Sequence, residues 1–236
     1  MSKVERANLP KRPKRVMLIH ALTESLEPIH RAFSVNWPEA EIYDLLDSSL
    51  SADHAANRGM LDTRMMERFK TLGRYAARTG SGDRATHGIL FTCSAFGKAI
   101  EAVKREIQIP VLTPNEAAFA AAIKVGQHIG LLTTFEPSLP ALSAEMHAVA
   151  RRSGVPLELE TRVIPDALTA LRQGRPEIHD TLIAEAASAL GPLDVAVLGQ
   201  FSMARAAKAV VSRVTAPVIT TPDSAVQELR RILESP

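Results

Sequence analysis

The second half of the chain repeats the first. A shift of 107 positions aligns residues 88–113 (GILFTCSAFGKAIEAVKREIQIPVLT) without a gap on residues 195–220 (VAVLGQFSMARAAKAVVSRVTAPVIT), and six of the 26 aligned residues are identical. A shift of 113 positions places residues 16–26 on residues 129–139. A solenoid needs three or more copies. The repeat therefore predicts two copies of one folding unit, which face each other across a cleft.

Each copy alternates short apolar runs with helix-length segments. This alternation predicts parallel sheets built from β-α-β units, whose buried strands are continuous runs of apolar residues. We expect an α/β fold of two pseudo-twofold-related lobes, each with a mainly parallel four-stranded sheet flanked by helices. The longest predicted helical segment is Ala55–Arg78. The predicted strands are Val16–His20, Glu41–Leu45, His87–Phe91, Pro110–Thr113, His128–Thr133, Leu157–Val163, Asp194–Leu198 and Pro217–Thr220.

Basic residues are concentrated at the start of the chain. Residues 1–15 carry six Lys or Arg against the single Glu5, whereas the whole chain has a formal charge of only +2. The rest of the chain is therefore slightly acidic. No aromatic residues lie between these charges, and no nucleic-acid-binding motif follows them. We interpret residues 1–15 as a flexible basic tail and expect no nucleic-acid partner.

The sequence also indicates where in the cell the protein is expected. The apolar run VMLIHAL (residues 16–22) is short for a secretory signal, and no stretch approaches the roughly 20 apolar residues of a membrane span. A single cysteine excludes an intramolecular disulfide. We therefore expect a cytoplasmic protein without a membrane partner.

Cys93 is the main candidate for a catalytic side chain. It ends an apolar strand and precedes a segment that is predicted to be helical from about Ala95. Near a helix N-terminus the pKa of a thiol falls from about 8.5 to as low as 3.5–7.5, and backbone N–H groups there stabilise a carboxylate or enolate. A buried structural cysteine is the alternative, but the strand-end position favours catalysis. The repeat aligns Cys93 with Gln200, so the two residues should face each other across the cleft.

Four segments resemble motifs of the aspartate/glutamate racemase superfamily. FTCSAFG (91–97) resembles the first-cysteine motif, and VLGQFSM (197–203) occupies the place of the second-cysteine motif. LIHALTES (18–25) resembles the first substrate-binding loop, and IGLLTTFEPS (129–138) resembles the Thr-rich third loop. The likeness covers residues 16–233, and the four motifs occur in the family's order.

The resemblance implies a domain organisation and an activity. The C-terminal helix would return to the first lobe, which would comprise residues 16–114 and 221–236, with the second lobe at residues 115–220. The family's racemases and isomerases act on small carboxylates, such as amino acids, without pyridoxal phosphate, another cofactor or a metal. In the racemases two cysteines flank the substrate α-carbon, and one removes a proton while the other returns one.

The resemblance also nominates binding residues beside the catalytic Cys93. Gln200 and Ser202 are candidates for the opposite wall of the site. Thr133 and Thr134 correspond to hydroxyls that bind a carboxylate, although residues of this type also cap helices. The complete set of candidate substrate-binding residues is His20, Thr23, Ser25, Asp47, Ser48, Ser94, Ala95, Phe96, Thr133, Thr134 and Ser138.

Gln200 departs from the family pattern, because a carboxamide does not exchange protons usefully near neutral pH. Three alternatives follow. Ser202 or a bound water could replace the second acid; Cys93 alone could protonate a carbanion formed by decarboxylation or elimination; or the thiolate could add to a double bond and permit cis–trans isomerisation.

Two rival functions lie outside the superfamily. A cysteine hydrolase needs a histidine beside Cys93, which the sequence does not nominate, and Phe91 stands where a nucleophile elbow has glycine. A non-catalytic, two-lobed ligand binder is the second rival. The seven histidines lack zinc-site spacing and no Gly-rich phosphate loop is present, so we expect neither a metal nor a nucleotide cofactor. Substrate identity and assembly into a homo-oligomer stay open.

Overall fold

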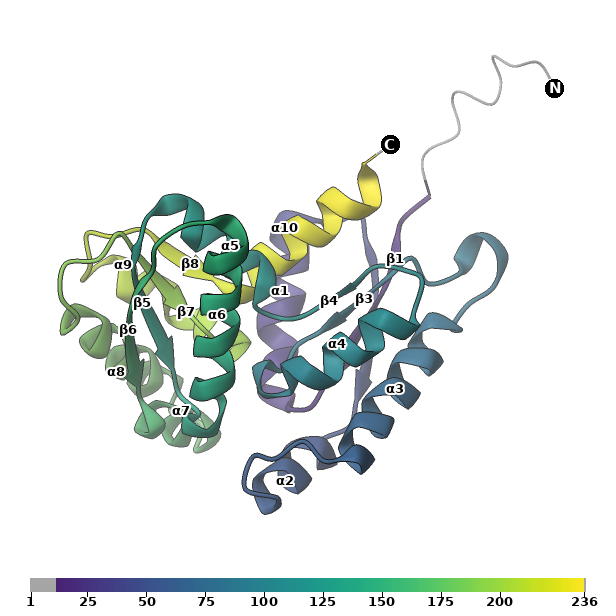
Figure 1. The fold of residues 1–236 in the computed structure, drawn as a ribbon, viewed down its shortest axis with the longest axis horizontal. Helices are drawn as coiled ribbons and strands as arrows, with labels where there is room; N and C mark the ends of the chain where they lie inside the picture. The colour runs from purple at the N-terminus through teal and green to yellow at the C-terminus, as the bar shows by residue number, and fades with distance from the viewer. Residues whose placement is uncertain (1–11, 236) are drawn as a thin grey trace, which may run out of the picture.

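Two four-stranded parallel sheets form the centres of two lobes (Figure 1). The computed structural model describes residues 12–235. The strand order is β2-β1-β3-β4 in the first sheet and β6-β5-β7-β8 in the second, so the sheets share one topology. All eight predicted strands are found with ends shifted by at most one residue. They are β1 (Arg15–His20), β2 (Glu41–Leu46), β3 (Gly88–Phe91), β4 (Val111–Leu112), β5 (His128–Thr133), β6 (Glu158–Val163), β7 (Val195–Leu198) and β8 (Val218–Thr220).

The register of the strands repeats as well. In the first sheet Ile19 of β1 pairs with Phe91 of β3, and in the second sheet Leu132 of β5 pairs with Leu198 of β7. These pairs are equivalent under the shifts of 113 and 107 positions found in the sequence. The two lobes are therefore structural copies, and the predicted α/β fold with two related lobes is confirmed.

Helices cover both faces of each sheet. In the first lobe one face is covered by α1 (Leu26–Asn36) and α10 (Thr221–Glu234), and the other by α2 (Ser49–Ala56), α3 (Thr63–Ala77) and α4 (Gly97–Glu106). In the second lobe one face is covered by α5 (Glu116–Val125) and α6 (Leu139–Ser153), and the other by α7 (Pro165–Arg172), α8 (Pro176–Ser188) and α9 (Ala207–Val211).

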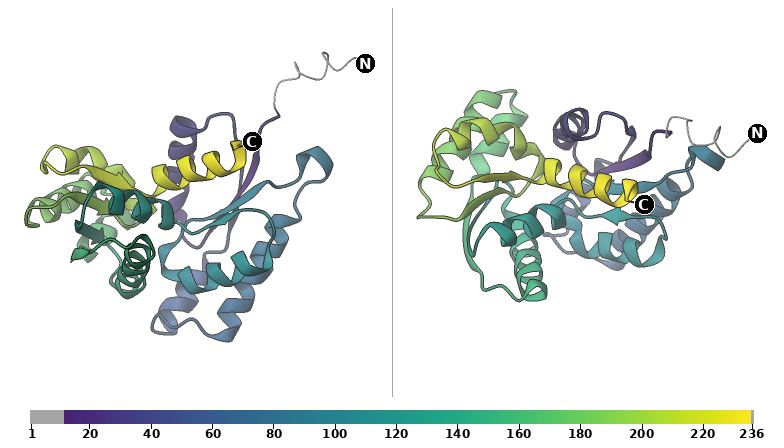
Figure 2. Two further views of the ribbon diagram at one scale, coloured as in Figure 1. Left: turned by 45° about the horizontal axis from the view of Figure 1, so that its top comes forward. Right: turned by 90° about the horizontal axis from the view of Figure 1, so that it is seen from above.

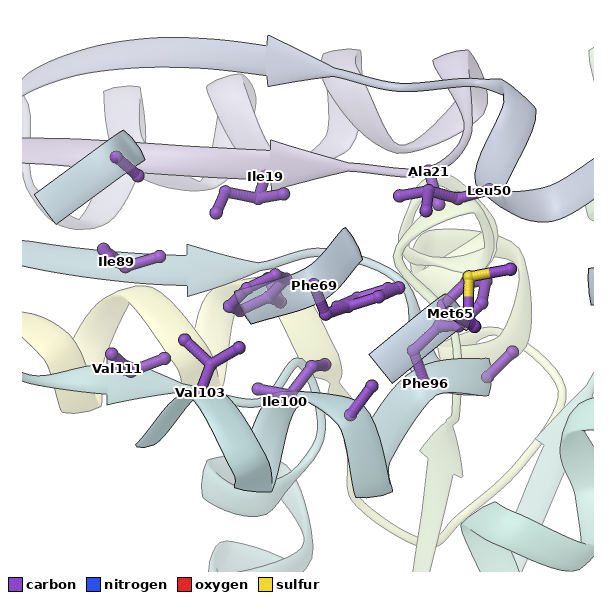
Figure 3. Close-up of a cluster of buried hydrophobic side chains, with 14 of the residues drawn as sticks. Ile19, Ala21, Leu50, Met65, Phe69, Ile89, Phe96, Ile100, Val103 and Val111 are labelled. Carbon is purple, nitrogen blue, oxygen red and sulfur yellow. The ribbon is translucent and has the colours of Figure 1, made fainter. Parts of the chain in front are cut away.

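Aromatic packing beneath α3 and α4 anchors the segment that follows Cys93. Phe96 is fully buried, and its ring centroid lies 4.7 Å from that of Phe69 in α3. Phe69 in turn stacks on Phe91 at 5.5 Å, so helix, strand and turn share one cluster (Figure 3). Burial of a phenylalanine side chain stabilises a fold by roughly 1.5–3 kcal/mol. This packing fixes the backbone on which Cys93 stands.

The last helix belongs to the first lobe. After β8 the chain leaves the second lobe, and α10 lies beside α1 in all views (Figures 1 and 2). Ala225, Val226 and Leu229 of α10 are fully buried in a cluster with Val16 and Leu18 of β1. The chain therefore crosses between the lobes twice, once after β4 and once after β8.

A capping box fixes the first of these crossings. Thr113 and Glu116 form the pattern Thr-x-x-Glu, in which each side chain satisfies the backbone N–H of the other residue. The Thr113 N–H donates to Glu116 Oε1 at 2.9 Å, and the Glu116 N–H donates to Thr113 Oγ1 at 3.3 Å. The carboxylate of Glu145, from α6 of the second lobe, accepts from Thr113 Oγ1 at 3.1 Å and from Asn115 Nδ2 at 3.3 Å. The second lobe is thereby fastened to the end of β4.

One predicted helix is wrong. The segment Ala55–Arg78 is not continuous, because α2 ends at Ala56 and α3 begins at Thr63. Arg58 and Gly59 between them have φ values of 52° and 77°, in the left-handed region, which ends a helix. Asp62 then caps α3 by accepting the Met65 N–H at 2.8 Å. The apolar spacing that predicted a helix is thus confined to α3.

The predicted basic tail at residues 1–15 falls largely outside the described residues, and Arg15 already belongs to β1. Within residues 12–235 no helix is long and apolar enough to cross a membrane. In the same part of the chain no group of three or more His, Cys, Asp or Glu side chains is placed to hold a metal ion.

Candidate active site

Segments that follow the carboxyl ends of strands from both sheets meet in the cleft between the lobes. They enclose a cavity of about 340 Å³ and, beside it, a hollow of about 30 Å³. Carboxyl-end loops are where α/β proteins bind ligands. The larger cavity is near the lower limit for ligand sites, and the hollow is about an order of magnitude smaller. The residues that line both are Leu22, Cys93, Ser94, Phe135 and Gln200.

Cys93 stands at the centre of this wall. It follows β3 after one residue and precedes η4 (Ser94–Phe96), a single 3-10 turn that leads into α4. The side chain is half-buried, and Cys93 lines both the cavity and the hollow. The predicted placement of a thiol between a strand end and a helical segment is found, although α4 itself begins only at Gly97.

The predicted acidity of the thiol is wrong. Burial raises the pKa of Cys93 to about 11, and the negative charge of Glu24 acts in the same direction. Hydrogen bonding from the backbone of Ala95 and from the side chain of Ser51 lowers the pKa but does not compensate for burial. The 3-10 turn offers far fewer aligned peptide dipoles than a helix that begins at the cysteine. The resting form of Cys93 near neutral pH is therefore the thiol.

Gln200 lines the same cavity and hollow as Cys93, as the sequence repeat predicted. Its carboxamide oxygen Oε1 accepts two hydrogen bonds from Thr134, one from the backbone N–H at 2.7 Å and one from Oγ1 at 2.8 Å. Thr134 is almost fully buried. These contacts fix the orientation of the amide, so its NH₂ group is the end left for a ligand. They also occupy the Thr134 donors that were predicted to hold a substrate carboxylate.

Several other predicted residues line the cleft. Ser48, Ala95 and Phe96 line the larger cavity, Ser25 and Ser202 line the hollow, and Ser94 lines both. They come from the segments after β1, β2, β3 and β7, so equivalent loops of both lobes contribute to one site.

His20 lies behind the wall of the cleft. It is fully buried at the end of β1, and its Nε2–H donates to Asp44 Oδ1 at 2.9 Å. Because Asp44 is an acceptor, the proton of a neutral imidazole is on Nε2, and Nδ1 is left as an acceptor. Nδ1 accepts from Thr92 Oγ1 at 2.9 Å, and Ser25 Oγ lies 3.2 Å from Nδ1. Burial lowers the pKa of His20, against the opposing effect of Asp44. His20 therefore supports Thr92 and Ser25, which line the hollow.

The remaining predicted binding residues line neither the cavity nor the hollow. Thr133 and Ser138 are fully buried, and their hydroxyl oxygens lie 3.2 Å apart. Thr23 is exposed and donates to Glu24 Oε2 at 3.2 Å. Asp47 accepts from Ser49 and from Arg68 Nη2 at 2.7 Å, which makes it part of a helix start and an ion pair. Their roles in binding stay predictions.

A larger groove of about 790 Å³ lies elsewhere, between α4, α5, α6 and α10. It is open to solvent, and neither Cys93 nor any other residue of the cleft contributes to it. Its walls are alanines of α5 flanked by basic and acidic side chains such as Lys124 and Glu228. The volume of this groove therefore does not indicate where the chemistry occurs.

The family model described as Asp/Glu/hydantoin racemase matches residues 64–229. The chain belongs to this family. The match includes Cys93 and Gln200, and it extends from the first turn of α3 into α10. The match covers most of the folded chain and three of the four short motifs, at residues 91–97, 129–138 and 197–203. No curated protein matches the chain.

Solved structures of racemases have the same fold as this member of the Asp/Glu/hydantoin racemase family. Glutamate racemase from Thermus thermophilus, in complex with β-chloro-D-alanine, has a TM-score of 0.71 at 15% identity, over 94% of this chain and 81% of that one. Picrophilus torridus aspartate racemase has a TM-score of 0.70 at 12% identity, over 93% and 94% of the chains. Allantoin racemase from Pseudomonas fluorescens has a TM-score of 0.62 at 19% identity, over 92% and 91%. Identities this low establish the two-lobed fold alone.

Sequence reasoning missed two charged residues of this racemase-family cleft. Arg172, from α7 of the second lobe, lines the larger cavity, and Glu24, from η2 (Thr23–Ser25) of the first lobe, lines the hollow. Arg172 Nε donates to Glu24 Oε1 at 2.9 Å across the cleft. Glu24 lies inside the first-loop motif and follows a strand end, so it could have been predicted as a site residue from the sequence. Arg172 ends a helix, and no local pattern distinguishes it.

Two residues of α2 were also missed. Ser51 and His54 line the larger cavity with Cys93. Ser51 Oγ donates to the carbonyl of Ala21 at 2.8 Å, and His54 Nε2–H donates to the carbonyl of Gly59 at 2.9 Å. These bonds hold α2 and the loop after it against the end of β1. Because one long helix was predicted from Ala55, the separate helix α2, whose residues line the cavity, was not predicted.

Proposed function

We propose that this protein is a cofactor-independent racemase or isomerase that transfers a proton at the carbon next to a carboxylate, with Cys93 as the principal catalytic residue. The observation that carries the proposal is the position of Cys93 in the shared wall of the cavity and the hollow. Family membership supports a racemase or isomerase. The names of the similar structures make glutamate, aspartate and allantoin the first compounds to test.

The charges around the cavity fit a carboxylate substrate. Arg172 is the cationic side chain among the residues that line it, and its side chain is half exposed. A guanidinium binds a carboxylate through two parallel N–H donors. The NH₂ group of Gln200 supplies a further donor from the same lobe. Removal of an α-proton then places negative charge on the carboxylate oxygens, which these donors stabilise.

A second candidate is a single-cysteine enzyme that protonates one face of a carbanion formed by decarboxylation or elimination. The specific observation in its favour is Gln200, which holds the place of a second proton donor and is bonded to Thr134. A thiol with a raised pKa is also the protonated form that such a step requires.

The test incubates the protein in D₂O with each enantiomer of glutamate, aspartate and allantoin, and with maleate and substituted malonates. Proton NMR follows deuterium uptake at the α-carbon, inversion and loss of carbon. We expect uptake with at least one of these compounds, and we expect Cys93→Ala to lower the rate of inversion about 10²-fold or more, as for removal of a general acid or base.

The matched control is Ser153→Ala, an exposed residue that lines neither the cavity nor the hollow. It should retain the rate of the wild type. Inversion that survives in a folded Cys93→Ala variant would refute the proposed role of the thiol. Loss of carbon without inversion would favour the single-cysteine alternative.

A further inference from the structure

A racemase needs two proton-transfer groups, one on each face of the substrate carbon, and Gln200 cannot be one of them. The residues that line the hollow beside Cys93 limit which side chain can be the second proton-transfer group. Of the described residues that line it, the side chains that titrate are those of Cys93 and Glu24. Ser202 also lines the hollow, but an unactivated hydroxyl exchanges protons with a carbanion far less readily than a carboxylic acid.

Glu24 is placed between the lobes. It lies in η2, which packs against η6 (Phe201–Ala206), the turn that follows Gln200 in the second lobe. The Glu24 side chain is 19% exposed, and its two oxygens are held by Arg172 and Thr23. Glu24 and Cys93 therefore line one hollow, to which second-lobe residues such as Gln200 also contribute.

The charge states of the two groups complement each other. Burial acts to raise the pKa of Glu24, but hydrogen bonds from its own backbone N–H and from Arg172 outweigh burial, so the net direction is downward. The thiol pKa is about 11, raised in part by the charge of Glu24. Near neutral pH the site therefore holds one carboxylate, which accepts a proton, and one thiol, which donates one.

We propose that Glu24 is the second catalytic residue of this site and takes the place of the missing second cysteine. The inference rests on the proposed function. In one direction the Glu24 carboxylate removes the α-proton, the C–H electrons move into the substrate carboxylate as an enediolate, and the Cys93 thiol protonates the opposite face of the carbon. The products are the inverted substrate, a protonated Glu24 and a Cys93 thiolate. The reverse direction uses these same two forms and restores the starting state.

Arg172 links substrate binding to the basicity of Glu24. A substrate carboxylate in the larger cavity competes with Glu24 for this guanidinium, which lines the cavity. Once Arg172 turns to the substrate, the carboxyl group of Glu24 keeps the hydrogen bond from its own backbone N–H but loses the contribution of Arg172 that lowers its pKa. Glu24 then becomes a stronger base in the presence of substrate than in the empty site.

The test uses Glu24→Gln and follows each enantiomer of the substrate separately in D₂O by NMR. If one base acts on each face of the substrate carbon, both variants should lose inversion, and each should lose α-proton exchange of a different enantiomer. Glu24→Gln should lose inversion by about 100-fold or more. It should still exchange the α-proton of the enantiomer that presents this proton to Cys93. Cys93→Ala should also lose inversion but retain exchange of the opposite enantiomer.

Glu27→Gln is the matched control, because Glu27 is an exposed glutamate three positions further along, outside the cavity and the hollow. It should invert substrate at the rate of the wild type. Inversion by Glu24→Gln at the rate of the wild type overturns the inference and leaves the proposed function intact. Equal loss of exchange for both enantiomers in Glu24→Gln reveals a structural role and also overturns it. If the wild type exchanges no compound of the panel, the proposed function fails and the inference fails with it.

A second measurement needs no turnover. The rate of alkylation of Cys93 by iodoacetamide, followed against pH, reports the pKa of the only thiol in the chain. Removal of the neighbouring negative charge in Glu24→Gln should shift this pKa downward, whereas Glu27→Gln should leave it unchanged. An unchanged thiol pKa in a folded Glu24→Gln variant places the carboxylate away from the sulfur and overturns the inference.

Discussion

Gln200 and Thr134 form a unit in which a side-chain amide occupies donors that a substrate carboxylate would otherwise use. Both bonds to Gln200 Oε1 are short, at 2.7 and 2.8 Å, and Thr134 is almost completely buried. Gln200 therefore occupies both donors of Thr134 with an amide that does not exchange protons usefully near neutral pH. A substrate of this protein is accordingly expected to depend on Arg172 more than on the third loop.

The replacement Gln200→Leu tests how strongly this unit is held. It leaves the N–H and the hydroxyl of Thr134 without their acceptor, and buried unsatisfied donors cost about 1–3 kcal/mol. We expect the free energy of unfolding in urea to fall by about that amount. Gln108→Leu is the control, since Gln108 is exposed, and should change stability by no more than about 0.5 kcal/mol. Equal stability of the two variants would show that the amide is free.

Site residues that lie at strand ends could be predicted from the sequence. Residues whose role depends on contacts with distant parts of the chain could not. Cys93 and Gln200 were paired by the repeat, because strand ends of equivalent units meet in space. The Glu24–Arg172 ion pair joins residues 148 positions apart, so no local pattern reveals it. The thiol pKa was predicted in the wrong direction because the helix effect is local, whereas burial is a property of the whole cleft.

Among the elements, strands were easier to predict than helix limits. The strands at the centres of the sheets, β1, β3, β5 and β7, are short and largely apolar runs that are buried on both faces, which gives them a clear pattern. Helix limits depend on the backbone conformation of a few residues. Arg58 adopts a left-handed φ of 52° although arginine has no preference for it. That residue separates α2 from α3 and brings α2 to the cleft.

The contact between α3 and α4 depends on a glycine. A Cβ atom added at Gly73 would lie 2.4 Å from Cγ1 of Val103, which is fully buried. Gly73→Ala should therefore lower the free energy of unfolding by about 1–3 kcal/mol, as overpacking does. The control is Gly97→Ala in α4, where an added Cβ meets nothing within 4 Å. In urea denaturation this control should be neutral or slightly stabilising; the opposite order would contradict the close approach of the helices.

For the whole molecule, the duplication explains both the fold and the asymmetry of the site. Identical topology and register make the strand ends of the two lobes equivalent, so one copy supplies Cys93 and the other Gln200. Cys93 and Glu24, the two proton-transfer groups proposed above, both belong to the first copy. The second copy contributes Arg172 and the amide wall. A symmetric scaffold thus carries an asymmetric set of functional groups.

Acid should destabilise the molecule as a whole. The pKa values of His20, His54, His87 and His179 are all lowered from 6.5, chiefly by burial. The unfolded chain therefore binds protons that the folded chain excludes as the pH falls through about 6.5. The stabilising effect of these neutral histidines is present above this pH and is lost below it. We expect the melting temperature, measured by calorimetry, to fall between pH 7.5 and pH 5.5.

Single variants separate this effect from other titrations. His20→Asn should reduce the dependence of the melting temperature on pH, whereas His147→Asn, at an exposed site, should not. Glu145 acts in the opposite direction, because burial raises its pKa and its protonation favours the folded form. A melting temperature that rises on acidification from pH 7.5 would contradict the prediction.

The return of α10 to the first lobe has a consequence for biosynthesis. Elements of the second lobe are contiguous in the chain, from α5 to β8, and can close around their sheet as soon as they leave the ribosome. The sheet of the first lobe is translated first, but it is not fully covered until α10 has been synthesised, because the 14 residues of α10 cover part of one of its faces. The lobe that carries Cys93 is therefore completed last, after its twin.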